Sequence, residues 1–222
     1  MTGKGIRIEG LRKHYGSGDT VVEALKGVNM EVAPGEVVGL IGPSGSGKST
    51  LLKCLGVVID PSEGRMTLGD EVIYDEGWQV RDLRALRRDR IGFVFQAPYL
   101  IPFLDVTDNV ALLPMLAGMP NAQARARAVE LLTALDVQHR AKAMPSQLSG
   151  GEILADEPTG PLDSERAMAV MRILNDMAKR YQTAIIVVTH DEKIIPTFKR
   201  IYHIRDGITH EEAGEGREIK TA

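Results

Sequence analysis

The segment from Gly42 to Ser49, GPSGSGKS, has the residue types and spacing of a phosphate-binding loop, G-x-x-x-x-G-K-[ST]. Glycines let several backbone N–H groups converge on phosphate oxygens, and the N-terminus of a following helix favours negative charge at the same point. Lys48 is expected to neutralise the β- and γ-phosphates, and Ser49 to ligate Mg²⁺. The segment therefore predicts a nucleotide-binding site formed by Gly42, Pro43, Ser44, Gly45, Ser46, Gly47, Lys48, Ser49 and Thr50.

Such a loop needs an acidic partner for Mg²⁺ at the end of a neighbouring buried strand. Asp156 in ILADEP fits this role, and Glu157 is placed to polarise an attacking water. The alternative is that both carboxylates lie in an exposed loop. His190 ends the apolar segment AIIVVTH. A histidine at the end of a strand is usually structural, but beside a phosphate-binding loop it can contact the γ-phosphate.

Apolar periodicity predicts the elements that position these residues. The β-branched run from Val37 to Ile41 indicates a buried strand before the loop, and residues 49–55 a helix after it. The segment 200–212 predicts a hairpin that turns at Asp206 and Gly207 and is followed by a frayed polar tail. In two N-terminal segments apolar and polar residues alternate, and this pattern predicts antiparallel strands. Further strands are expected over 91–96 and 184–190, and helices over 80–90, 164–181 and 121–137, the last with Val129, Leu132 and Leu135 on one face.

The composition supports one large α/β domain. The chain has 222 residues, of which 43% are hydrophobic and 26% charged, and its net charge of −3 gives no reason to expect a nucleic-acid partner. A single cysteine, Cys54, excludes a disulfide framework and favours a reducing compartment. The N-terminus lacks an apolar core of signal-peptide length, and no run approaches the ~18 apolar residues of a membrane span. Any work at a membrane would then require a partner.

Six motifs in order resemble the nucleotide-binding subunit of an ABC transporter over nearly the whole chain. They are GPSGSGKST, FVFQ with Gln96, LSGGE (148–152), LADEP (154–158), PLD ending at Asp163, and VVTHD ending at Asp191. The resemblance implies a P-loop ABC-type ATPase domain spanning residues 1–222, of α/β class. It would have a parallel core sheet, an N-terminal antiparallel β layer, a helical subdomain at about 97–151 and a polar tail at about 211–222.

The resemblance also implies a role for each motif. Tyr15 would stack on adenine, Gln96 would complete the Mg²⁺ shell, and His190 would hold the γ-phosphate. The chain would act as a Mg-dependent ATPase in a dimer with a second copy of itself, with Asp163 across the interface. In that dimer the ATP bound by one copy would be clasped by three signature residues of the other, Ser149, Gly150 and Gly151.

The segment from Ala97 to Gly118 narrows the resemblance to exporters that include MacB-like and LolD-like subunits and, most similar, DevA-like ones. This group implies an integral-membrane permease, a periplasmic adaptor protein, and a peripheral location on the cytoplasmic face of the inner membrane. One apolar cluster could receive the permease or form the core of the helical subdomain, and the sequence favours neither. It consists of Tyr99, Leu100, Ile101, Phe103 and Leu104.

The chain departs from the family between two motifs. A helix and half a strand, roughly 15 to 20 residues at ordinary element lengths, separate LSGGE from ILADEP in the family. Here Glu152 is followed directly by Ile153. We expect ATP binding to survive this junction, and efficient hydrolysis and the ATP-closed dimer to be impaired.

Three functions therefore stay open. The first is an ATP-hydrolysing subunit that energises export, and the second is an ATP-binding subunit with impaired hydrolysis. The third, an ABC-type ATPase of DNA repair or translation, is disfavoured by the negative net charge and the lack of a long coiled-coil insert.

Overall fold

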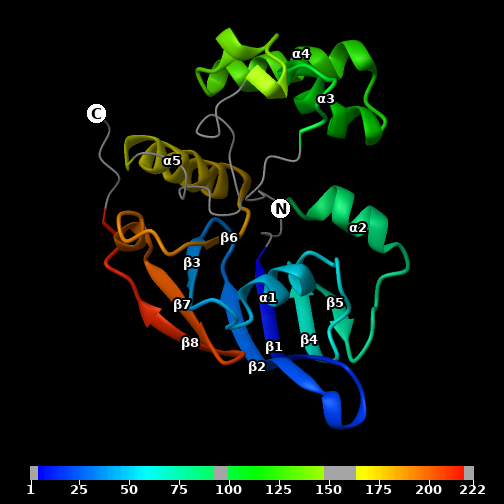
Figure 1. Cartoon of the computed structure of the whole chain (residues 1–222), viewed down its shortest axis with the longest axis vertical. Helices are drawn as coiled ribbons and strands as arrows, with labels where there is room; N and C mark the ends of the chain where they lie inside the picture. The colour runs from blue at the N-terminus through cyan, green and yellow to red at the C-terminus, as the bar shows by residue number, and fades with distance from the viewer. Residues whose placement is uncertain (1–4, 93–99, 148–163, 218–222) are drawn as a thin grey trace. The chain divides into compact units, whose positions relative to one another are not determined.

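The computed structural model describes residues 5–92, 100–147 and 164–217 (Figure 1). The chain divides into two compact units. The first comprises residues 1–94 and 156–222, and the second residues 95–155. The first unit contains both sheets and the second contains helices α3 and α4.

An antiparallel sheet of four strands forms the N-terminal part of the first unit, in the order β2-β1-β4-β5 (Figure 1). It consists of β1 (Ile6–Tyr15), β2 (Val22–Val32), β4 (Glu63–Leu68) and β5 (Glu71–Asp75). Leu25, Val28 and Met30 of β2 are buried, whereas the side chains between them lie nearer the surface. The predicted antiparallel layer is confirmed.

The second sheet has the order β6-β3-β7-β8. It consists of β3 (Val37–Ile41), β6 (Ile185–Val188), β7 (Arg200–Arg205) and β8 (Ile208–Ala213). β3 pairs in parallel with β6 and with β7, and β7 and β8 form the predicted hairpin. The two turn residues, Asp206 and Gly207, have φ values of 49° and 80°, as a tight hairpin turn requires.

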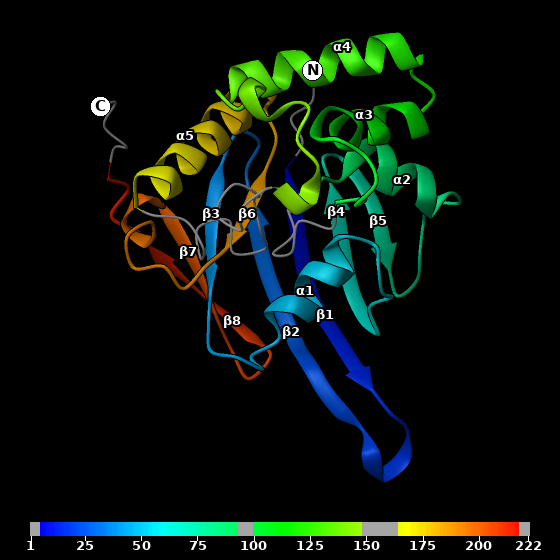
Figure 2. The same cartoon turned by 45° about the horizontal axis from the view of Figure 1, so that its top comes forward.

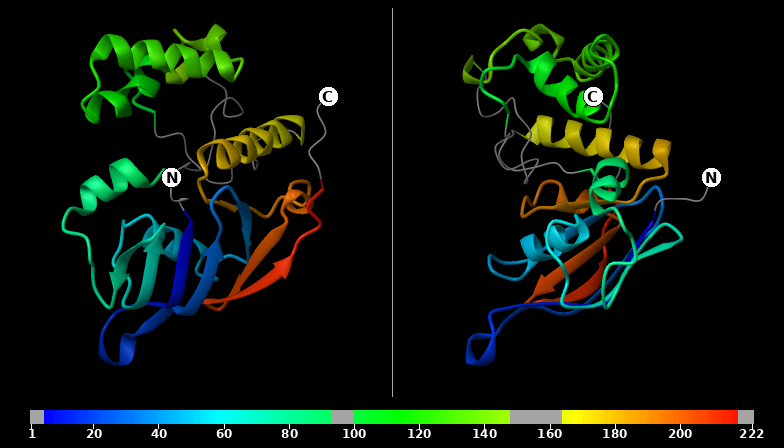
Figure 3. Two further views of the ribbon diagram at one scale, coloured as in Figure 1. Left: turned by 180° about the vertical axis from the view of Figure 1, so that it is seen from behind. Right: turned by 90° about the vertical axis from the view of Figure 1, so that its right-hand side faces the viewer.

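Both faces of β3 are covered, as expected for a strand in a parallel sheet. Val38 and Leu40 pack in the core shared with α1 (Lys48–Leu55) and the antiparallel sheet. Val37 packs in a second core with α5 (Ser164–Tyr181). Figure 3 shows this unit from two further sides. The end of β3 is therefore fixed from both sides where the phosphate-binding loop begins.

The second unit contains α3 (Val106–Leu116) and α4 (Asn121–Ala134). Its core cluster consists of three buried alanines, Ala111, Ala124 and Ala128. Small side chains allow two helices to approach closely at these positions.

Of the three apolar residues predicted to share one face of α4, the structure buries only one. Leu132 is buried, but Val129 and Leu135 are 47% and 42% exposed. The buried face instead runs through Ala124, Ala128 and Leu132, at the four-residue spacing of one helix stripe. The helix also ends at Ala134 rather than residue 137.

Other predicted boundaries shift for local reasons. α2 (Leu83–Arg90) starts three residues late, because the Asp82 carboxylate caps it by accepting from two backbone N–H groups. β6 is shorter than predicted, and only Val187 among its residues is fully buried. The strand expected over 91–96 falls mostly outside the described residues, and Ile91 and Gly92 belong to no strand.

The described part of the tail after the hairpin is held by backbone hydrogen bonds, contrary to the expected fraying. Gly214, Gly216 and Arg217 donate backbone hydrogen bonds to residues 199, 198 and 196. No helix within the described ranges is long and apolar enough to cross a membrane.

Candidate nucleotide-binding site

The phosphate-binding loop connects the end of β3 to the start of α1, and its path can be followed in Figure 2. Gly45 and Gly47 have φ values of 79° and 107°, which L side chains rarely adopt. Gly47 immediately precedes α1, whose first backbone N–H groups have no partner within the helix. These N–H groups and the helix dipole favour an anion at the loop.

The loop lies directly on its two supporting strands. A Cβ atom at Gly42 would be 2.2 Å from the carbonyl oxygen of Ile204 in β7. A Cβ atom at Gly47 would be 2.7 Å from the carbonyl oxygen of Ala24 in β2. Because these neighbours are backbone atoms, they cannot move aside as a flexible side chain could. Glycine is therefore required at both positions for this path of the loop.

The turn between β7 and β8 ties the loop to β2. The backbone N–H of Gly207 donates to the carbonyl oxygen of Ser46 at 3.0 Å, and the Gly207 carbonyl accepts from the N–H of Lys26 at 2.8 Å. The Asp-Gly dipeptide predicted the turn, but no local pattern links residue 207 to residue 46. Gly207 is thus a supporting residue of the site that sequence reasoning missed.

The Lys48 ammonium is held by the loop itself. Its Nζ donates to the carbonyl oxygens of Gly42 at 2.6 Å and of Pro43 at 2.7 Å. The Ser49 side chain, one residue further along α1, is exposed. Lys48 and Ser49 are the first two residues of α1, at the N-terminal end of the helix. The glycine cradle, the ammonium and the free helix end together fit a di- or triphosphate.

His190 lies at the same edge of the sheet as the loop. β6 runs parallel to β3, with Val188 opposite Leu40, so both strands reach this edge at their carboxyl ends. The buried Thr189 donates its backbone N–H to the Leu40 carbonyl at 3.4 Å, and its hydroxyl accepts from the N–H of Asp191 at 3.0 Å. These bonds fix the backbone on both sides of the exposed His190.

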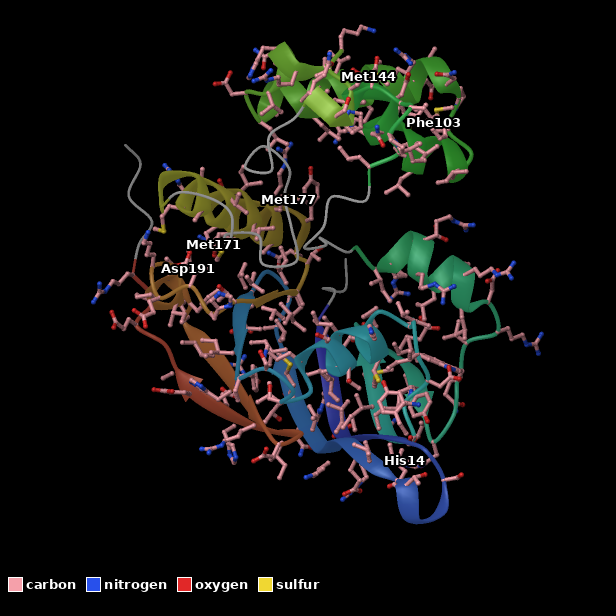
Figure 4. The ribbon with its side chains drawn as sticks, viewed as in Figure 1. His14, Phe103, Met144, Met171, Met177 and Asp191 are labelled. Atoms are coloured by element: carbon pink, nitrogen blue, oxygen red, sulfur yellow. The ribbon has the colours of Figure 1, made fainter. Side chains whose placement is uncertain are left out.

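Tyr15 ends β1, opposite Val22 of β2, and is 44% exposed. The Lys13 ammonium lies 5.1 Å from the centre of its ring, a distance that favours a cation–π contact. His14, between them, is labelled on the same hairpin in Figure 4. An exposed aromatic face is compatible with the adenine-stacking role, which stays a prediction.

The remaining predicted site residues lie outside the described residues, so the structure does not place them. They are Gln96, the signature residues Ser149, Gly150 and Gly151, the acidic pair Asp156 and Glu157, and the interface residue Asp163. Of the apolar cluster, Phe103 is 77% exposed, Leu100, Ile101 and Leu104 are half-buried, and Tyr99 is not described. The exposure of Phe103 contradicts a core role for that residue.

A glycine loop between a buried parallel strand and a helix, with a lysine at its mouth, defines a P-loop nucleotide-binding protein. The comparison with protein families narrows this class. Residues 25–159 match the family described as ABC transporter. The chain belongs to this family.

Relatives of known name extend the match to most of the chain. The lipoprotein-releasing system ATP-binding protein LolD of Novosphingobium aromaticivorans is 37% identical, over 91% of this chain and 97% of the relative. The macrolide export ATP-binding/permease protein MacB of Chromobacterium violaceum is 42% identical over 93% of this chain. The chain spans only about a third of the length of MacB, since 34% of that protein is covered.

Solved structures give the same result. The ATP-binding cassette MJ0796, in a dimeric post-hydrolysis state bound to ADP and Pi, superposes with a TM-score of 0.83 at 33% identity. The match covers 96% of this chain and 99% of that one. The fold class is therefore confirmed as that of an ABC-type ATPase cassette.

The alignments are longer than the part of this chain that they cover. The LolD alignment runs over 220 positions, whereas 91% of the 222 residues of this chain is about 202 residues. About 18 positions of the alignment therefore have no residue in this chain. Their number agrees with the roughly 15 to 20 residues predicted to be missing between LSGGE and ILADEP.

Proposed function

We propose that this chain is the ATP-binding and ATP-hydrolysing subunit of an ABC-type export system. The observation that carries the proposal is the glycine loop built against β2 and β7, with Lys48 at its mouth. Family membership supports ATP as the nucleotide, and the printed names of the LolD and MacB relatives support export.

In this proposal the residues of the loop bind the phosphates. The backbone N–H groups and the Lys48 ammonium hold the β- and γ-phosphates against the N-terminus of α1. Ser49, Gln96 and Asp156 would hold Mg²⁺, which when bound neutralises phosphate charge. The exposed Ser49 hydroxyl fits this role.

The chemical step would require residues that come after the loop in the sequence. Glu157 would orient a water molecule for in-line attack on the γ-phosphate, and His190 would donate to that phosphate from the end of β6. In a dimer, Ser149 to Gly151 of one copy would close over the ATP held by the other. The dimeric state of MJ0796 supports this arrangement.

The permease would dock on the helical unit. Phe103, Leu113 and Leu116 are each more than 70% exposed, at 77%, 75% and 72%. Exposed apolar side chains on one small unit indicate an interaction surface. The chain would then lie at the cytoplasmic face of the inner membrane through this contact. A periplasmic adaptor protein stays a prediction from the DevA-like resemblance.

A second candidate function is ATP binding without efficient turnover. The direct Glu152–Ile153 junction favours it, together with the 18 or so unmatched positions in the relatives. Losing the helix that follows the signature would remove the dipole which that helix presents to the partner's γ-phosphate.

Steady-state Mg-ATP hydrolysis by the purified chain, measured beside Glu157→Gln, distinguishes the two. Turnover that vanishes in the variant supports the hydrolysing subunit. Bound ATP with no turnover above the variant supports the second candidate. Failure to bind ATP at all would overturn both.

A further inference from the structure

A polar groove with a volume of about 410 Å³ lies in the first compact unit and shares no residue with the phosphate-binding loop. Three segments line it: α5, the segment that leads into β7, and the segment that follows β8. These segments lie side by side in Figures 1 and 3.

One wall is a strip of α5. Arg172, Asp176 and Lys179 line the groove at positions i, i+4 and i+7, which places them on one face of a helix. The adjacent face carries Met171 and Ala178, which are buried against the sheet. Met171 is labelled on α5 in Figure 4. Packing of the helix therefore fixes the direction in which the polar strip faces.

The opposite wall is held by backbone hydrogen bonds. Gly214 and Arg217 donate their N–H groups to the carbonyls of Lys199 and Pro196, at 2.9 Å and 2.8 Å. A Cβ atom at Gly214 would lie 2.2 Å from the carbonyl oxygen of Phe198, so the two segments touch at backbone distance. The backbone at Lys199 and Arg217 is therefore fixed by hydrogen bonds between the two segments.

The groove concentrates positive charge on a chain whose net charge is −3. Its lining includes four cationic side chains, Arg172, Lys179, Lys199 and Arg217, and one acidic side chain, Asp176. Glu215 forms an ion pair with Arg217 and offsets part of this excess. Among the described residues, neither the Lys179 nor the Lys199 ammonium has an acidic partner.

We propose that this groove is a second anion site, which binds a phosphate group. Like charges gathered in one concavity repel one another, and a multiply charged anion relieves that repulsion. Guanidinium forks match two phosphate oxygens at once, and lysine ammonium groups add charge without a fixed geometry. A phosphate group carries up to two charges and several acceptor oxygens, and so matches these donors better than a single carboxylate.

The test is calorimetric titration of the full chain with inorganic pyrophosphate at low salt, with the phosphate-binding loop saturated by ADP. We expect one further binding event, weakened at least about tenfold by Lys179→Glu and by Lys199→Glu. Binding should also weaken as salt is raised, because exposed charges are screened. Arg180→Glu is the matched control. It reverses the charge of the residue next to Lys179 on α5, and Arg180 does not line the groove. Circular dichroism confirms that each variant folds.

Co-sedimentation with phosphatidylglycerol vesicles identifies the source of the phosphate. Binding to vesicles that Lys179→Glu abolishes and Arg180→Glu preserves assigns the site to a lipid headgroup. Pyrophosphate binding without vesicle binding assigns it to a soluble phosphate compound. Absence of both, or equal weakening by Arg180→Glu, overturns the proposal.

Discussion

The two compact units differ in how completely they bury their own apolar side chains. The first unit has two cores, which cover both faces of β3. The helical unit has a core cluster of three alanines and leaves Phe103, Leu113 and Leu116 largely exposed. The packing of the first unit fits the proposed role of holding a loop in one conformation, and the exposed side chains of the second fit the proposed docking surface. The proposed nucleotide site and the proposed docking surface therefore lie in parts with different packing.

The largest expected effect is in the phosphate-binding loop. Gly47→Ala should destabilise the chain by ~2–3 kcal/mol and abolish measurable ADP binding, because it combines an unfavourable φ with a contact to the Ala24 carbonyl. Gly45→Ala is the matched control, since its φ is also positive but its Cβ would meet open space. It should cost only about 1 kcal/mol. Equal losses, measured by urea unfolding and ADP titration, would show that the contact with β2 is unimportant.

A second comparison concerns the helical unit. Leu132→Ala should lower the free energy of unfolding by about 2–5 kcal/mol, because Leu132 is buried. Phe103→Ala should change it by less than about 0.5 kcal/mol, because Phe103 is 77% exposed. Chemical denaturation of both variants tests this difference.

Under the proposed docking, Phe103→Ala should instead reduce retention of the chain by a permease in a pull-down from membranes. A large loss of stability on truncating Phe103 would show that the side chain belongs to the core, and the division between the two units would fail.

The turn between β7 and β8 should affect nucleotide binding through the loop. Gly207→Ala introduces a side chain at a φ of 80°, with its Cβ 2.9 Å from the Ala24 carbonyl, and should cost about 1–3 kcal/mol. ADP affinity should fall as well, because Gly207 supports Ser46. Gly10→Ala, whose φ is 59° and whose Cβ would meet no atom within 4 Å, is the control. Unchanged ADP affinity in a folded Gly207→Ala chain would remove the turn from the site.

The smallest effect concerns the helix behind the loop. Cys54 is fully buried in α1, and burial raises the pKa of its thiol to about 11. Because the thiolate is the reactive form, the folded chain should resist iodoacetamide at pH 7.5 under conditions that fully label the urea-unfolded chain. Mass spectrometry measures the labelled fraction. Rapid labelling of the folded chain would show that α1 opens readily.

Sequence patterns predicted the parts of the fold that short-range rules govern. The strand Val37–Ile41, the helix Ser164–Tyr181 and the Asp206–Gly207 turn all lie where apolar period and turn chemistry placed them. Which residues of α4 are buried could not be predicted in this way. Hydrophobicity favoured Val129 and Leu135, but close approach of two helices selected alanines.

Short-range sequence patterns also predict only part of the candidate site. The motif alone identifies Lys48 and the glycines, because its spacing encodes their chemistry. The contacts of Gly42 with Ile204 and of Gly207 with Ser46 join segments about 160 residues apart in the chain. No local sequence pattern predicts such long-range contacts, so the residues that hold the loop in place are identified only in the folded structure.

The central claim is that the first unit carries a nucleotide site already shaped by its own backbone. Calorimetric titration of the purified chain with Mg-ADP, beside Lys48→Ala, tests it most directly. We predict one ADP per chain, and an affinity reduced about ten- to hundredfold in the variant, which loses a charge-assisted contact worth ~1.5–3 kcal/mol. No binding by the unaltered chain, or equal binding by Lys48→Ala, would contradict the account.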